Sequence, residues 1–230
     1  MKNKDKSAKL LAWVFMRLRE RFGKKIPSRQ KDLTSLLVLT VLSQNTNDTN
    51  RDRAFKNLRQ KFPKWTDLLT APAHEIEKAI RVGGLSRQKA TRIKDILSRI
   101  KVERGSLDLS FMCAMPMPDA REYLLGFKGV GEKTAAVLLL FGCGMPAFPV
   151  DTHIFRVSKR LGIIPQKANE KKAHQVLGAA IAPEACHELH LNMIELGKKI
   201  CRPRKPQCPI CPLKARCQYH AHAVKNEPAA

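Results

Sequence analysis

The sequence contains few acidic side chains. Its 230 residues include 20 Asp and Glu against 43 Lys and Arg, which gives a formal net charge of +23 at pH 7. Such an excess indicates a polyanionic partner, because Lys and Arg side chains that neutralise phosphates release counterions. Structural proteins of the ribosomal type share this charge, so composition alone does not indicate an enzyme. A hydrophobic content of 43% predicts a folded body that carries a basic face.

Long apolar segments are also missing. The longest uninterrupted apolar run, Ala135 to Phe141, is far shorter than the roughly 20 residues that span a bilayer. The charged residues 1–6 contain no apolar stretch of signal-peptide length. We therefore expect a cytoplasmic protein with no membrane partner.

Strand-like alternation and internal repeats are absent from the sequence as well. Apolar residues recur instead at helical spacing, and the run 32–43 is apolar nearly all round, which is typical of a buried helix. Ser86 is expected to cap the helix that follows it. The periodicity predicts helices at 8–22, 32–43, 48–62, 73–82, 86–103, 152–161, 168–181 and 184–199. The predicted fold class is therefore all-α.

A glycine turn joins two apolar stretches in the middle of the chain. Leu124 and Phe127 fit the buried side of one helix, and a second helix begins near Glu132. Gly129 and Gly131 allow positive φ and close approach of the backbone, while the free N–H groups of the second helix point out of the turn. This arrangement predicts an anion-binding site suited to a phosphate. An ordinary helical hairpin is the simpler alternative.

Two ionisable residues accompany this turn. Lys133 falls in the first turn of the second helix, where the helix dipole disfavours a protonated amine, and partial burial would favour the neutral amine further. Asp151 follows 18 residues later, directly before the next helix. Taken alone, Lys133 is a solvated surface lysine and Asp151 is a helix N-cap.

Together these segments resemble a known family. The stretch Leu124 to Ala135, with its Gly-Val-Gly-x-Lys-Thr-Ala motif, and the stretch Val150 to Val157, Val-Asp-Thr-His-Ile-Phe-Arg-Val, are similar to the endonuclease III family of helix-hairpin-helix DNA glycosylases. The resemblance implies a six-helix barrel lobe at 32–145, with the helix-hairpin-helix at about 123–141. It also implies a second helical lobe made of 1–31 and 146–230.

The resemblance implies an activity and roles for two residues. Lys133 is expected to be the Schiff-base nucleophile and Asp151 its catalytic partner. The expected enzyme is a bifunctional DNA glycosylase and AP lyase that removes damaged pyrimidines. Its partner would be double-stranded DNA with a damaged base or an abasic site, bound by a monomer associated with the nucleoid of a prokaryote. The alternatives are a monofunctional mismatch glycosylase and a non-catalytic DNA-binding relative.

Further residues are expected to contact DNA. The polar loop 43–48 is a simple turn when taken alone, but in the family the corresponding loop fills the space left by an extruded base, which predicts Gln44 or Asn45 as the wedge. Gly84 closes a second candidate phosphate site, for which a helix C-cap is the alternative. Two residues depart from the family pattern, Lys128 in the hairpin and Leu125 before it. The remaining predicted contacts are Gly129, Gly131 and Thr134.

Four of the seven cysteines lie close together near the C-terminus, at Cys201, Cys208, Cys211 and Cys217. Four thiolates suit tetrahedral zinc or a [4Fe-4S] cluster, and the 6-2-5 spacing resembles the iron–sulfur loop of endonuclease III. The resemblance therefore implies a [4Fe-4S] cluster at 201–217, in a structural and DNA-binding role. Disulfides are not expected, and the isolated cysteines, together with His153, are predicted to be structural. These isolated cysteines are Cys113, Cys143 and Cys186.

Overall fold

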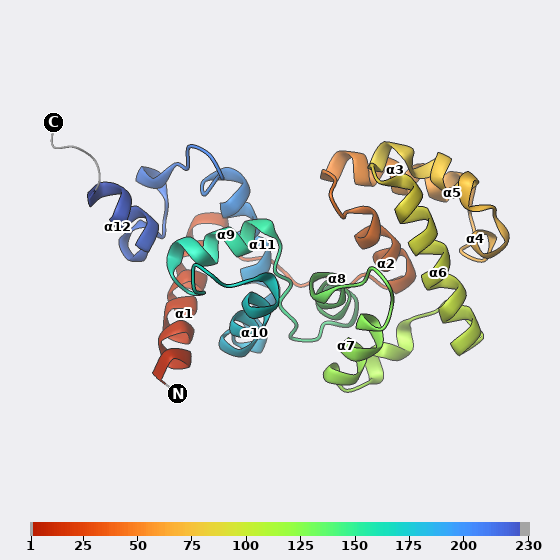
Figure 1. Ribbon diagram of the computed structural model, residues 1–230. Coiled ribbons are helices and arrows are strands. Elements are labelled where there is room, and N and C mark those ends of the chain that lie inside the picture. The colour runs from red at the N-terminus through yellow and green to blue at the C-terminus, as the bar shows by residue number, and fades with distance from the viewer. Residues whose placement is uncertain (1, 226–230) are drawn as a thin grey trace. The chain divides into compact units, whose positions relative to one another are not determined.

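The computed structural model describes residues 2–225 (Figure 1), and within this range every regular element is helical. The all-α fold predicted from the sequence is confirmed. The chain forms two compact units, a middle unit of residues 29–144 and a terminal unit of residues 1–28 and 145–230. The boundaries predicted from the family resemblance were 32 and 145.

The middle unit is built around α2 (Leu33–Leu42), which is buried along most of its length. Its side chains Leu37, Val38 and Val41 are at most 2% exposed. The Asp32 carboxylate caps the helix by accepting a hydrogen bond of 2.9 Å from the backbone N–H of Ser35. α2 packs against α3, α6 and α8. The central buried helix expected from an apolar run of this length is therefore present.

The helices predicted at 48–62, 73–82 and 86–103 and the helix-hairpin-helix occur in the predicted order, with small differences at their ends, and several short elements between them were not predicted. They are α3 (Asp48–Lys61), α4 (Asp67–Thr70), α5 (Ala73–Ile80), the 3₁₀ turn η1 (Arg81–Gly83), α6 (Ser86–Arg104), the 3₁₀ turn η2 (Ser110–Ala114), α7 (Met117–Leu125), α8 (Glu132–Val137) and the π-helical turn η3 (Leu138–Cys143). Ser86 does not cap α6 as predicted. It is the first helical residue, and the N-cap position is held by Leu85 in a left-handed conformation.

The terminal unit packs helices from both ends of the chain. Its elements are α1 (Lys2–Phe22), α9 (Thr152–Leu161), α10 (Glu170–Ala180), the 3₁₀ turn η4 (Pro183–Ala185), α11 (Cys186–Lys199), the 3₁₀ turns η5 (Cys208–Ile210) and η6 (Lys214–Arg216), and α12 (Gln218–Lys225). α1 packs against α10 and α11, and α9 against α11 and α12. Arg19 of α1 donates two hydrogen bonds, of 2.7 and 2.8 Å, to the buried Glu188 carboxylate of α11. This pair joins segments that are 169 residues apart.

One expectation about the cysteines is wrong. Cys113 of η2 and Cys143 of η3 form a disulfide, with Cα atoms 4.8 Å apart. The two residues are 30 positions apart, and only the packing of η2 against η3 brings them together. Their spacing in the sequence therefore carries no sign of the bond. Cys186 is a buried free thiol, as predicted.

Within residues 2–225, no helix combines the length and apolar character that crossing a membrane requires.

Candidate functional site

The predicted hairpin is formed by α7, a turn at 126–131 and α8. Phe127 and Val130 anchor the turn in the core, with 2% and 5% of their surfaces exposed. Gly129 has φ +88°, a value that favours glycine, and this part of the prediction is confirmed. Gly131 is different, because its φ of −104° is extended backbone that any residue adopts. Only one of the two glycines is therefore required by backbone conformation.

Lys133 is the second residue of α8 and its side chain is exposed. The position of Lys133 in the first turn of the helix agrees with the sequence, but the partial burial considered for its side chain is not found. Its neighbour Glu132 forms a bidentate ion pair with Arg121 of α7, which ties the two helices of the hairpin together. Lys128 is exposed on the turn, whereas Thr134 is 4% exposed. Any contact of Thr134 with a ligand must therefore come from its backbone.

The loop between α2 and α3 lies against this hairpin. The Gln44 side chain donates a hydrogen bond of 2.9 Å from Nε2 to the Gly129 carbonyl oxygen. Its Oε1 accepts a hydrogen bond of 3.0 Å from Nη1 of Arg92 on α6. Asn45 is exposed and has φ +52°, a left-handed conformation that is uncommon outside glycine. The structure thus brings Gln44 and Gly129, two predicted site residues, into direct contact.

A second turn lies at the start of α6. Gly84 has φ +66° and ends η1 by donating its N–H to the Arg81 carbonyl, so the C-cap alternative is correct for its backbone role. Leu85 follows with φ +48° and has 52% of its surface exposed. An exposed leucine in a strained conformation marks a candidate contact residue. The sequence analysis missed it, because leucine gives no signal of positive φ.

Lys89 is another residue that the sequence analysis missed. Its side chain is 1% exposed and donates hydrogen bonds of 2.7 Å to the Leu42 carbonyl and 2.8 Å to the Gly83 carbonyl. Burial lowers the pKa of the Lys89 amine. The residue ties the end of α2 to the turn before α6. The sequence did offer one signal, because Lys89 lies at helical spacing from Ile93 and Ile96 on the apolar face of the predicted helix.

Asp151 stands at the start of α9 in the terminal unit. Its Oδ1 accepts a hydrogen bond of 2.7 Å from the backbone N–H of Ile154, so the residue is an N-cap, and the side chain is half-buried. His153 lies beside it, with Nδ1 3.2 Å from Nη2 of Arg156, and its Cβ packs closely on Gly197 of α11. The structural role predicted for His153 agrees with these contacts. Lys133 belongs to the middle unit and Asp151 to the terminal unit, so their catalytic pairing stays a prediction.

The four clustered cysteines are all free thiols and line one cavity, together with Arg160 of α9. The Arg160 guanidinium donates to the Cys201 sulfur at 3.3 Å and to the carbonyls of Arg202 and Pro203 at 2.7 and 3.0 Å. Arg156 donates to the Cys201 carbonyl at 2.9 Å. Asp151 therefore caps the start of α9, and Arg156 and Arg160 of the same helix hold the cysteine loop. Burial raises the pKa of Cys211 to about 11.

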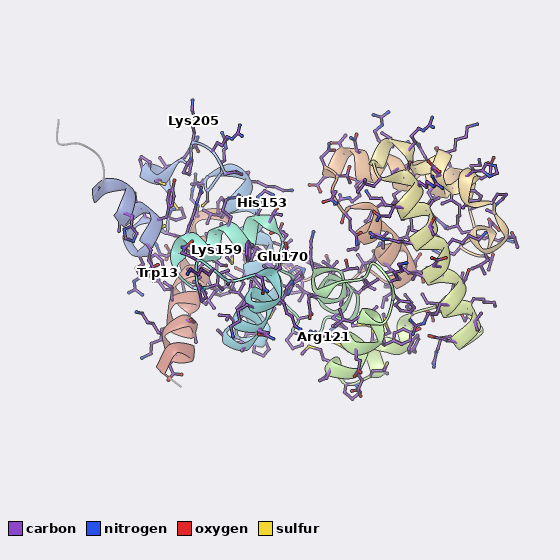
Figure 2. All side chains as sticks on the ribbon, viewed as in Figure 1. Trp13, Arg121, His153, Lys159, Glu170 and Lys205 are labelled. Carbon is purple, nitrogen blue, oxygen red and sulfur yellow. A yellow bond between two sulfur atoms is a disulfide. The ribbon has the colours of Figure 1, made fainter. Side chains whose placement is uncertain are left out.

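The cavity between the four cysteines is small, about 20 Å³. Among residues 2–225, no three candidate ligands are arranged around one metal position. Four free thiols nevertheless line one common cavity, and four thiolates suit either a zinc ion or an iron–sulfur cluster. The surrounding loop is basic, and Lys205 has φ +48° with a side chain that extends away from the rest of the unit (Figure 2). A cluster bound by four thiolates is anionic, so these cations suit it.

A separate groove of about 830 Å³ lies in the terminal unit between α1, α10 and residues 161–165. The predicted site residues that the structure describes lie outside it. The candidate functional residues are therefore taken from the hairpin and the loop 43–47 of the middle unit and from the cysteine loop of the terminal unit, and not from this groove.

Comparison with known proteins identifies the family. The model of the HhH-GPD superfamily base excision DNA repair proteins matches residues 38–183. The chain belongs to this superfamily. Endonuclease III of Thermotoga maritima is 35% identical over 206 residues, which cover 89% of this chain and 92% of that protein. The chain thus belongs to the endonuclease III family within the superfamily, and the resemblance seen in the sequence is confirmed.

A plant protein and a solved structure are also similar. The putative DNA glycosylase At3g47830 of Arabidopsis thaliana is 42% identical over 162 residues, and the match spans 70% of this chain and 55% of the plant protein. The structure of a trapped endonuclease III–DNA covalent intermediate matches with a TM-score of 0.79 and 29% identity, covering 94% of this chain and 98% of that one. The predicted class, a DNA glycosylase and AP lyase of base excision repair, is confirmed.

Proposed function

We propose that this protein is a bifunctional DNA glycosylase and AP lyase that removes damaged pyrimidines from duplex DNA. The observation that carries the proposal is Lys133, exposed on the first turn of α8 directly after a glycine hairpin, in a chain of the endonuclease III family. An amine is required for the lyase reaction, because a hydroxyl group or water cannot form an imine with the sugar. The hairpin presents two exposed amines, Lys128 on the turn and Lys133 at the start of α8, and Lys133 is the one in the motif position of the family's nucleophile.

The reaction begins when the neutral amine of Lys133 attacks C1′ of the damaged nucleotide. The glycosidic bond breaks and the base leaves with the electron pair, and it takes up the proton that the attacking amine has passed to Asp151. Asp151 stabilises the cationic character that develops at the sugar and accepts the proton from the attacking amine. Ring opening then yields an imine between Lys133 and C1′. The imine acidifies the C2′ proton, whose removal expels the 3′ phosphate, and water finally hydrolyses the imine and frees the lysine.

DNA is held by backbone N–H groups and by cationic side chains. Gly129 and Gly131 let a phosphate approach the start of α8, where Lys128 adds a positive charge. The turn at Gly84 offers a second phosphate contact, and Leu85 beside it presents an apolar side chain that can insert between base steps. Extrusion of the damaged nucleotide costs a few kcal/mol of unstacking, and the loop 43–47 occupies the space that it leaves.

We assign a [4Fe-4S] cluster to Cys201, Cys208, Cys211 and Cys217. The support is a cavity lined by four free thiols within a loop whose regular elements are the short 3₁₀ turns η5 and η6. A bound cluster would fix the shape of this basic loop, since metal binding and folding are coupled. Arg160, which reaches Cys201 and two carbonyls of the loop, holds the loop on α9. Iron and acid-labile sulfide analysis of the purified protein, against Cys211→Ala, tests the assignment.

The experiment that tests the activity is borohydride trapping on a duplex with one oxidised pyrimidine. The wild type is expected to form a covalent protein–DNA complex and to cleave the strand at the 3′ side of the lesion. Lys133→Gln is expected to abolish both, while the exposed Lys128→Gln keeps the trapped complex and weakens DNA binding. A complex that still forms with Lys133→Gln removes Lys133 from the mechanism. Release of a normal base from a mispair without strand cleavage would instead identify a monofunctional mismatch glycosylase.

A further inference from the structure

Helix α6 holds three separate turns of the middle unit with three basic side chains. Lys89 donates to the carbonyls of Leu42 and Gly83. Arg99 donates to the Gly126 carbonyl at 2.6 Å. Arg92, which lies between them along the helix, donates to Gln44. Because residues seven positions apart lie on nearly the same line of a helix, Arg92 and Arg99 face the hairpin together.

The Gln44 amide is fully oriented by its two partners. A carbonyl oxygen accepts only from the NH₂ group, and a guanidinium donates only to the amide oxygen. Gln44 meets both requirements, at 2.9 Å to Gly129 and at 3.0 Å from Arg92. A half-buried side chain with both ends engaged has lost its freedom to turn outward toward another molecule.

Arg92 also touches the hairpin directly. A Cβ atom built on Gly129 would lie 2.7 Å from Cδ of Arg92 and 2.8 Å from its Nε. The stem of Arg92 therefore fills the space that a side chain at 129 would need. Arg92, Gln44 and Gly129 form one contact set drawn from α6, the loop 43–47 and the hairpin, and the last two are 85 residues apart.

Asn45, the next residue of the loop, differs from Gln44 in its exposure and in its backbone conformation. It is exposed, whereas Gln44 is half-buried, and its backbone has a left-handed φ of +52°. A non-glycine residue in this conformation costs on the order of 1 kcal/mol or more. The pinned Gln44 on one side and the Asn47 N-cap of α3 on the other keep the strained residue in place.

We infer that Gln44 is a positioning residue that fixes the loop 43–47 to the hairpin through Arg92 and Gly129, and that Asn45 is the residue this loop inserts into DNA. The inference rests on the proposed function for its DNA-bound part. The two neighbouring amides thus have different roles, because Gln44 holds the loop in place and Asn45 enters the DNA. The contacts of Gln44 also mean that the loop and the hairpin of Lys133 move as one body.

The test combines two single variants with their double variant. Gln44→Leu and Arg92→Met each break the contact set while keeping side-chain bulk, and Gln44→Glu keeps the acceptor for Arg92 but loses the donor to Gly129. Arg53→Met on the exposed face of α3 removes one charge as a control. Base release is measured on duplexes that carry one oxidised pyrimidine opposite each of the four bases.

Gln44→Leu and Arg92→Met are each expected to slow base release by roughly ten- to a hundredfold. A displacement of a catalytic group by about 1 Å lowers a rate by up to this factor. The double variant is expected to be no slower than the slower single variant within about twofold, because both changes break the same contact. Neither single variant should change the ratio of rates among the four opposite bases. Asn45→Ala should change that ratio.

The inference is overturned if Gln44→Leu alone changes the opposite-base ratio more than threefold while Asn45→Ala leaves it unchanged, because Gln44 would then be the wedge. Additive losses in the double variant would also overturn it. Hydrogen–deuterium exchange on the free protein provides a readout that needs no activity. Exchange in 43–47 and 127–131 should rise together in Gln44→Leu and in Arg92→Met, and unchanged exchange in either segment refutes the positioning role. If the wild type releases no base at all, the proposed function fails, and the exchange experiment still decides this contact set.

Discussion

Asp151 accepts a hydrogen bond of 2.7 Å at Oδ1 from the backbone N–H of Ile154, so the proposed catalytic carboxylate is also the N-cap of α9. The two roles can be separated because asparagine caps a helix as well as aspartate does. Asp151→Asn is expected to keep the free energy of unfolding within about 0.5 kcal/mol of the wild type and to lose base release. Asp151→Ala should lose base release and also about 1 kcal/mol of stability. Urea unfolding measures the stability of both variants, and single-turnover base release measures their activity. Full activity in Asp151→Asn would show that Asp151 acts only as a helix cap.

The two hairpin glycines should respond differently to alanine. Gly129 has φ +88° and its Cβ position is filled by Arg92, so Gly129→Ala is expected to cost about 1–2 kcal/mol of stability through backbone conformation alone. Gly131 has extended backbone and open space within 4 Å of its Cβ position. Gly131→Ala should therefore leave stability unchanged and weaken binding to an abasic-site duplex, because the methyl group meets the phosphate. Equal stability losses in the two variants would contradict this assignment.

The Arg19–Glu188 pair should make the terminal unit sensitive to acid. The hydrogen bond from Arg19 lowers the pKa of the Glu188 carboxyl, so the charged form is favoured in the folded state. This stabilisation is complete above the ordinary glutamate pKa of about 4.3 and is lost as the pH falls through the lowered folded-state value. Arg19→Met is therefore expected to unfold at lower urea concentration at pH 7, with a difference from the wild type that shrinks below about pH 4. Lys9→Met serves as the charge-matched control, and a difference that does not depend on pH would contradict the role of Glu188.

Local signals in the sequence account for the helices and for several caps. The apolar run 32–43, the period of Ile154, Val157 and Leu161, and Asp151 before that run predicted α2 and α9 nearly to the residue. These signals succeed because helix ends depend on side chains within a few positions. The four-residue α4 carries no period and was not predicted.

Contacts between distant residues were not predictable from one sequence. Gln44 was predicted to meet DNA, but nothing near it indicates that its amide is held by Gly129 and Arg92. Leu85 is missed for a related reason, since its positive φ is imposed by the turn at Gly84 and not by its own preference. Tertiary packing decides the contacts of Gln44 and the neighbouring turn decides the conformation of Leu85, and neither effect can be seen in the type of the residue itself.

The Cys113–Cys143 disulfide closes a segment that contains the whole hairpin and Lys133. By the chain-entropy model a closed loop of 30 residues stabilises the folded state by about 3.5 kcal/mol. Reductant is therefore expected to lower the free energy of unfolding of the wild type by a few kcal/mol. The double variant Cys113→Ser, Cys143→Ser should show the lower value from the start and respond no further to reductant, which separates this bond from effects on the cysteine loop 201–217. Alkylation of the unfolded protein without reductant, read by mass spectrometry, should leave both residues unlabelled, and labelling of either one shows that the pair is not bonded.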